Sequence, residues 1–412
     1  MGFSLVMPFM AMYLVEERGA RATTYGAIYL LAGAVAAASQ ALAGELADRV
    51  GRRVVMVTAL VLRVFNLAGI GLAVLVHAPI WALGALIVSN GFLRAQFEPA
   101  ASAAVTDLAP PEARVAAYGL QRMGVNLGWA IGPALGAGLA LFSYGAMFFF
   151  AAPVTIFAAA AVWTVRDRRR PAEVRADPAE PRGDVLATLT GNRPFLVYLG
   201  LVFAGSIMTV QLFSTLSVFA HTELGLSRAD IGLVYTVNGA LVVLLQVPAV
   251  VLIERGGPRR ALLVGPALYA LAYLGVGFAS GFTSLALAVA LLTAGEVAFA
   301  PALADMAAHL GDPRRLGRAF GLFGLMQQLG LSLGPLVGGA VYDHLRHRHV
   351  VMWGAIAGGM AVVGLGYLAF TLVVLRRDRD LHRVELGAVA VDGVQRDPAA
   401  GDLAVDEVDD GL

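Results

Sequence analysis

The chain has 412 residues, of which 58% are hydrophobic and 14% charged, and its formal net charge is +1. Soluble globular domains carry about 25% charged residues, so this composition excludes an ordinary soluble domain and indicates a chain surrounded mostly by lipid. The chain contains no cysteine, which excludes disulfides, thiolate chemistry and cysteine-based metal sites.

Long apolar stretches recur along the chain, and most reach the roughly 20 residues that a helix needs to cross a bilayer core. They predict an all-helical integral membrane protein with helices near residues 2–15, 25–43, 54–76, 80–104, 115–140, 145–164, 195–219, 230–253, 260–280, 283–308, 318–341 and 350–375. The first covers only about 21 Å of a roughly 30 Å core. We expect either that residues upstream complete this helix or that the start codon is misassigned.

The arginines are distributed unevenly between the two sides of the predicted membrane. With the N-terminus inside, 22 arginines lie in the inner loops and ends and five in the outer loops. Because basic residues concentrate on the cytoplasmic side, both termini are predicted to be cytoplasmic. The basic residues are all arginine, which we interpret as a GC-rich bacterial coding bias, so we expect a multi-pass protein of the plasma (inner) membrane of a bacterium.

A basic, proline-bearing stretch divides the helices into two groups of six. We predict a six-helix bundle over residues 1–164, a cytoplasmic linker over 165–193 and a second six-helix bundle over 194–376. The tail over 377–412 carries acids and has no apolar periodicity, so we predict a disordered cytoplasmic segment.

The two halves repeat each other. GLQRMGVNLGWAIGPALGA from Gly119 and GLFGLMQQLGLSLGPLVGG from Gly321 share the spacing of their glycines and of Gly-Pro, at an offset of 202 residues. A weaker match pairs QALAGELADRVGRR from Gln40 with QVPAVVLIERGGPRR from Gln246. Repeated halves predict a pseudo-twofold axis along the membrane normal and a substrate site between the halves, near the middle of the membrane.

The loop after the second helix contains a glycine- and arginine-rich motif, with Gly44, Asp48, Arg49, Gly51, Arg52 and Arg53. Gly51 permits a tight turn, and Asp48 can lie against the positive N-terminus of a neighbouring helix. The segment resembles the cytoplasmic loop motif of the major facilitator superfamily, which is itself the standard instance of the repeated architecture. The resemblance implies that Asp48 latches onto the helix beginning near Arg318 in the outward-open state. The alternative is an ordinary basic cytoplasmic loop.

The fifth and eleventh helices carry the repeated glycine and proline motif, with Gly128, Gly132, Pro133 and Gly136 in one and Gly330, Gly334, Pro335 and Gly338 in the other. Proline bends a helix, and aligned glycines allow close helix packing. The fifth-helix run resembles the antiporter motif of this superfamily, apart from Ala137, where a glycine is usual. The resemblance implies the twelve-helix drug/proton antiporter branch and export; the alternative is a packing role alone.

Charges at membrane depth are costly unless paired, which makes them functional candidates. Arg94 resembles the family's fourth-helix motif, which implies a role in proton coupling, although Glu98-Pro99 departs from that motif. Arg94 and Glu98 are one turn apart and can pair, and Arg122 of the fifth helix lies at a depth similar to that of Glu98. A place between two arginines favours a structural ion pair for Glu98 over a proton carrier.

Glu296 lies in the middle of the tenth helix with no basic residue within one turn. Burial disfavours its charged form, which makes it a candidate proton carrier. The repeat places it opposite Arg94. We expect the two side chains to pair in one conformation and a proton or a cationic substrate to break the pair; the alternative is that Glu296 bonds a local hydroxyl and only packs.

No phosphate-binding loop, nucleophile–base arrangement or metal-ligand spacing occurs in the sequence, so we expect neither an enzyme nor a cofactor. The first hypothesis is a secondary transporter that exports small amphipathic compounds or drugs by proton-coupled alternating access. The second is an uptake symporter or facilitator for a small metabolite, and the third is a non-transporting sensor or scaffold. The expected partners are the lipid bilayer, a small-molecule substrate and protons, with no nucleic acid, and we expect a monomer.

Overall fold

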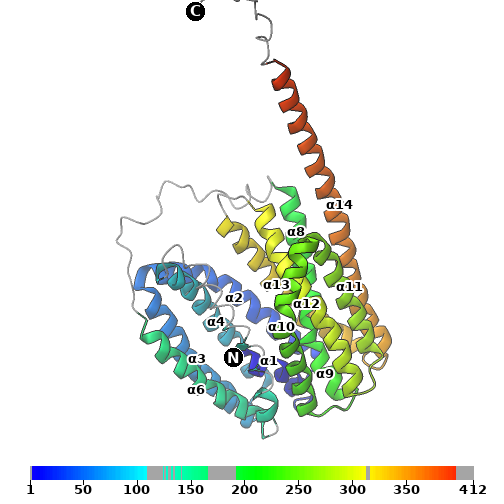
Figure 1. Ribbon diagram of the computed structural model, residues 1–412. Helices are drawn as coiled ribbons and strands as arrows, with labels where there is room; N and C mark the ends of the chain where they lie inside the picture. The colour runs from blue at the N-terminus through cyan, green and yellow to red at the C-terminus, as the bar shows by residue number, and fades with distance from the viewer. Residues whose placement is uncertain are drawn as a thin grey trace, which may run out of the picture. The chain divides into compact units, whose positions relative to one another are not determined.

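The computed structural model describes residues 2–108, 124, 127–128, 131–132, 135–140, 142–165, 192–311 and 316–395, and the regular structure of these residues is helical (Figure 1). By its internal contacts the chain forms two compact units, Met1–Tyr367 and Leu368–Leu412. The first unit contains all the groups discussed below.

The helices of the first half are α1 (Gly2–Met12), the π-helical turn η1 (Tyr13–Glu17), α2 (Ala22–Val50), α3 (Arg52–Leu75), α4 (Ile80–Leu108) and α6 (Tyr144–Trp163). The second half contains α8 (Arg193–Thr209), the 3-10 turn η4 (Val210–Leu212), α9 (Thr215–Thr222), α10 (Arg228–Gly256), α11 (Pro258–Gly277), α12 (Phe282–Leu310), α13 (Leu316–Leu345) and α14 (His349–Gln395). In the described part of the chain, ten helical segments are long and apolar enough to cross a membrane. Most of the predicted helix near 115–140 and of the linker over 165–193 lies outside the described residues.

The helix predicted over 195–219 is interrupted, and the side chain of Gln211 accounts for the break. Its Nε2 donates to the carbonyl oxygens of Ile207 (2.7 Å) and Gly334 (2.9 Å), while its Oε1 accepts from the hydroxyl of Thr215 (2.6 Å). The side-chain amide therefore binds the carbonyl oxygen of Ile207, which in a regular helix would accept a backbone N–H. The chain continues through η4 into α9.

Helix α14 extends beyond residue 376, where the sequence predicted the second bundle to end. Its backbone is helical to Gln395, so the structure differs from the predicted disorder over 377–395, and residues 396–412 lie outside the described residues. The sequence offers a reason for the extension, since no proline interrupts α14 and the next one along the chain is Pro398.

Glycines bring α13 close to both halves. A Cβ added to Gly330 would overlap the carbonyl oxygen of Phe203 on α8, and a Cβ on Gly33 of α2 would overlap Ser332 of α13. Gly334 and Gly338 approach η4 and Gln211 in the same way, and α13 continues as one helix through Pro335. The seam between α2 and α13 therefore depends on residues without side chains.

The repeat is visible in the backbone of two turns. Gly51, between α2 and α3, has φ 100° and ψ 143°, and Gly257, between α10 and α11, has φ 84° and ψ 143°. Both values of φ lie in the region that favours glycine. The two halves thus make the same turn with the same residue type at the positions that the sequence repeat aligned.

Candidate transport cavity

A cavity of about 360 Å³ lies between helices of the two halves. Its apolar lining includes Val6, Met10, Leu67, Ile70, Ile87, Phe148, Val210, Phe213, Val242, Val243 and Leu331, and its polar and charged lining consists of Tyr29, Arg63, Asn90, Arg94, Asn238, Glu296, Gln328 and Ser332. Ligand sites have this composition, with a mostly apolar wall and a few convergent polar groups.

The charged residues of the lining are divided between the halves. Arg63 of α3 and Arg94 of α4 belong to the first half, whereas Glu296 of α12 belongs to the second. The structure therefore places Arg94 and Glu296 in the lining of one cavity, at positions related by the 202-residue repeat. Their direct pairing stays a prediction.

Asn238 contacts the carboxylate of Glu296. Its Nδ2 donates to Oε2 of Glu296 at 3.1 Å and to the hydroxyl of Thr293 at 2.8 Å. Thr293 in turn donates to the carbonyl oxygen of Val289 at 2.7 Å, which fixes its hydroxyl. Among the described residues, Glu296 is thus held by an amide from α10, and the alternative of a structural role stays open.

Arg63 is a cavity residue that the sequence analysis did not select. Its Nε and Nη2 atoms are buried and have no hydrogen-bond partner among the described residues. One turn away, Asn66 accepts from Nδ2 of Asn90 at 2.7 Å, which joins α3 to α4 beside the two arginines. An arginine in the middle of an apolar helix was a visible signal, but nothing in the sequence indicated that α3 faces the cavity.

Several predicted site groups lie outside the described residues. These are Arg122, Pro133 and the side chains of Glu98, Asp48 and Arg49, so the latch and the Glu98 ion pair stay predictions.

Other predicted site residues are described. Gly44 and Arg52 lie at the end of α2 and the start of α3, and the guanidinium of Arg53 lies 5.0 Å from the ring centre of Trp163. The backbone of Gly128 and Gly132 is helical, and Gly136 packs against Leu5 and Phe9 of α1.

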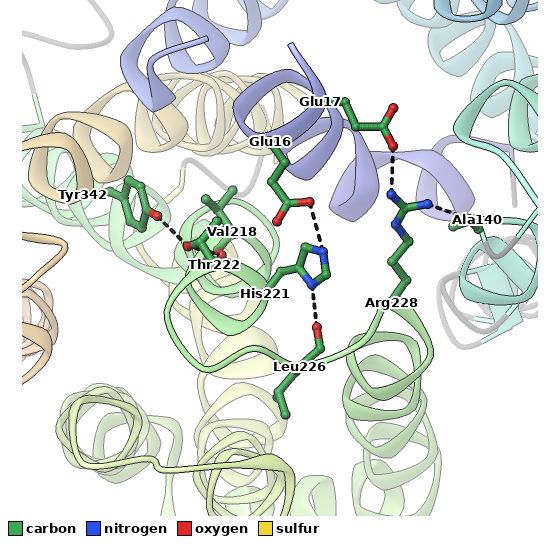
Figure 2. A network of polar contacts seen from close by, with 9 residues as sticks. All are labelled: Glu16, Glu17, Ala140, Val218, His221, Thr222, Leu226, Arg228 and Tyr342. Atoms are coloured by element: carbon green, nitrogen blue, oxygen red, sulfur yellow. Dashed lines mark hydrogen bonds and ion pairs between the residues drawn. The ribbon is translucent and has the colours of Figure 1, made fainter. Parts of the chain in front are cut away.

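The two halves are joined by charged contacts at one end of the bundle, formed by η1, α9 and the start of α10 (Figure 2). Nε2 of His221 lies 3.0 Å from Oε2 of Glu16, and Nη2 of Arg228 lies 2.8 Å from Oε1 of Glu17. Arg228 also donates from Nη1 to the carbonyl oxygen of Ala140 at 3.0 Å. We call Glu16, Glu17, His221 and Arg228 the interhalf ion pairs. The arginine distribution predicts that this end faces the outside of the cell.

Two further contacts join the halves at the same end. The carboxylate of Asp343, near the end of α13, accepts hydrogen bonds from the backbone N–H groups of Ala22 and Thr23, both at 3.0 Å. The guanidinium of Arg228 lies 4.2 Å from the ring centre of Tyr144. No sequence pattern predicted these contacts, because their partners come from distant parts of the chain.

The lining offers no obvious place for a metal. Among the described residues, no group of three or more His, Asp or Glu side chains is arranged to hold an ion. What the arrangement offers instead is a carboxylate and two guanidinium groups on opposite walls of an otherwise apolar cavity.

Two bundles around a central cavity with buried charges define a multi-pass membrane transporter. The chain belongs to the Major Facilitator Superfamily, whose family model matches residues 1–227 and 199–399. This membership confirms the predicted fold class, an all-helical membrane protein with two repeated six-helix bundles.

Similar proteins agree with this assignment. The chain is 24% identical to YqjV of Bacillus subtilis, an uncharacterized MFS-type transporter, over 94% of each chain. It is 26% identical to the multidrug resistance protein MdtH of Enterobacter sp. (strain 638), over 83% of each chain.

Two solved structures share the fold at low sequence identity. One is the nucleoside transporter NupG, with a TM-score of 0.71 and 16% identity over 90% of this chain and 95% of that one. The other is a bacterial homolog of the human lysosomal transporter Spinster in an inward-facing and occupied conformation, with a TM-score of 0.73 and 15% identity over 91% and 94%.

Proposed function

We propose that the protein exports small amphipathic compounds in exchange for protons, by exposing the cavity alternately to the two sides of the membrane. The observation that carries this proposal is Glu296, the one acidic residue among the described residues that line the cavity. A carboxylate at membrane depth is costly to maintain and marks a proton or substrate pathway by default. The relatives named multidrug resistance protein MdtH support the choice of small amphipathic compounds as substrates.

The geometry suggests how exchange works. Asn238 positions the carboxylate of Glu296 at the wall of the second half, so that a proton and a substrate compete for one site. The interhalf ion pairs hold the end that is predicted to face outward closed in this conformation. Release of a substrate to the outside then requires His221 and Arg228 to separate from Glu16 and Glu17, while the halves rock about the glycine-lined seam of α2 and α13.

Reconstituted vesicles test the proposal. The purified protein is placed in proteoliposomes with an imposed proton gradient, and uptake of the fluorescent cation ethidium is recorded together with the internal pH. We expect proton flux coupled to ethidium movement in the wild type and loss of that coupling in Glu296→Gln, because the amide cannot take up the transported proton. Coupled transport that survives this substitution would exclude Glu296 as the carrier.

A matched control has the same chemistry outside the cavity. Glu223→Gln replaces a carboxylate that lies 3.4 Å from Nε2 of His349, away from the cavity lining. We expect this variant to retain coupled transport.

The same vesicles test the alternative of a facilitator. Entry of a metabolite into them down its own gradient, without proton flux, would support a facilitator and contradict proton-coupled export.

A further inference from the structure

Arg63 occupies an unusual position for a charged side chain. It lies in α3 near the middle of a 24-residue apolar span and lines the cavity between the halves. Two of its three nitrogen atoms, Nε and Nη2, are buried without a hydrogen-bond partner among the described residues. Buried donors are almost always satisfied, and a guanidinium that lacks partners is expensive. This cost indicates that a ligand completes the site.

Among the described residues that line the cavity, no acid of the first half lies beside Arg63. Glu296 is on the opposite half, and its Oε2 already accepts from Asn238. On the same half Arg94 also lines the cavity, and its positive charge repels that of Arg63. Among the described lining residues, therefore, two positive charges face one negative charge, and the positive charges share one wall.

The wall around the arginines is fixed rather than adaptable. The hydrogen bond between Asn90 and Asn66 joins α4 to α3 one turn away from each arginine, and Asn66 also donates to the carbonyl oxygen of Leu86 at 3.1 Å. Leu67 and Ile70, on the same helix as Arg63, add an apolar surface to the cavity. A guanidinium on a fixed wall, next to an apolar surface, suits a compact anionic group attached to an apolar body.

From this arrangement we infer that Arg63 is the binding site for an anionic group, such as a carboxylate, of the transported amphipathic compound. The carboxylate accepts hydrogen bonds from Nε and Nη2 of Arg63, and the apolar body extends into the cavity towards the wall with Asn238 and Glu296. The volume of about 360 Å³ lies at the small end of the range of sites that hold drug-sized ligands. The substrate class thus includes carboxylate-bearing amphiphiles. The inference rests on the proposed function only in taking this cavity as the transport site.

Binding of three matched probes tests the inference without any gradient. Naphthylacetate, naphthylacetamide and naphthylmethylamine share one aromatic body and differ in charge, and their binding to the protein in lipid nanodiscs is measured by equilibrium dialysis against empty nanodiscs. We expect naphthylacetate to bind about tenfold more tightly than the neutral amide, because hydrogen bonds between ions are about twice as strong as neutral ones. Equal or tighter binding of the amide or the amine by the wild type would overturn the inference by itself.

Substitutions then assign the preference to one residue. In Arg63→Gln we expect the ratio of the naphthylacetate and naphthylacetamide affinities to fall to about one, and in Arg63→Lys to lie between this value and that of the wild type, because lysine keeps the charge without the planar fork. Arg348→Gln, in an exposed turn outside the cavity, should keep the wild-type ratio. An unchanged ratio in Arg63→Gln or in Arg63→Lys would refute the role of the guanidinium, so the lysine variant decides even if the glutamine variant fails to fold.

The failure of this inference is distinguishable from failure of the proposed function. If the wild type shows no proton-coupled transport but binds naphthylacetate through Arg63, the anion site is supported and the export mechanism is refuted. If the wild type exports ethidium with coupled proton flux but shows no preference for naphthylacetate, the export mechanism is supported and the anion site is refuted.

Discussion

Arg228 joins the second half to the first through several contacts at once. Among the described residues it contacts three groups of the first half, namely the carboxylate of Glu17, the carbonyl oxygen of Ala140 and the ring of Tyr144. Because all three belong to the opposite half, opening of this end must break all of them. Arg228→Gln therefore removes interactions that exist only in the closed conformation.

The magnitude follows from the three contacts. The side chains of the ion pair are 26% and 36% exposed, so water screens it and its contribution is about 0.5 kcal/mol. The hydrogen bond to Ala140 adds about 1 kcal/mol, and the cation–π contact with Tyr144 about 0.5 kcal/mol. A loss of about 2 kcal/mol moves the equilibrium between closed and open about thirtyfold towards open.

The chain contains no cysteine, so two cysteines introduced for spin labels give a clean distance measurement. Val76, at the end of α3, and Ser280, between α11 and α12, are exposed positions on the two halves. Double electron–electron resonance between these labels should report one main distance in the wild type and a large added population at longer distance in Arg228→Gln. Glu17→Gln, which removes the ion pair alone, should shift the ratio only about twofold.

The control is another arginine at the same end of the bundle. Arg346 is exposed and donates from Nε to His347, its neighbour in the chain. Arg346→Gln should leave the distance distribution unchanged. If Arg228→Gln gives the wild-type distribution, the interhalf contacts do not hold this end closed and the reasoning is refuted.

Two further predictions concern the seam and its end. Gly330→Ala should lower the free energy of unfolding by about 1–3 kcal/mol, because the added Cβ overlaps Phe203 and Ser206. Gly324→Ala, on the same helix, meets no described atom within 4 Å and should be tolerated. Equal thermal stability of the two variants in detergent would contradict this prediction. Asp343→Ala should lower the free energy of unfolding by about 0.5–2 kcal/mol, because it removes the acceptor for two N–H groups at the start of α2. Asp343→Asn should recover part of this loss. A thermal melt of Asp343→Ala identical to that of the wild type would show that the cap does not contribute.

Local patterns in the sequence were enough to predict the class of protein and its internal symmetry. Apolar stretches long enough for a bilayer and the glycine and proline repeat are local patterns, so they predicted the helices and the superfamily without a structure. The turn glycines Gly51 and Gly257 were aligned by the repeat, and their backbone conformations match. The pairing of Arg94 with Glu296 as opposite positions followed from the same repeat, and both line the cavity.

Which faces of the helices meet could be seen only once the helices were packed together. An amphipathic period predicts a helix face only when one side is polar, and these helices are apolar around most of their circumference because they contact lipid as well as protein. The sequence therefore could not place Arg63 in the cavity or bring Asn238, 58 residues away, to Glu296. Nor could it pair Glu17 with Arg228 across 211 residues, because that contact depends on how the two halves pack against each other.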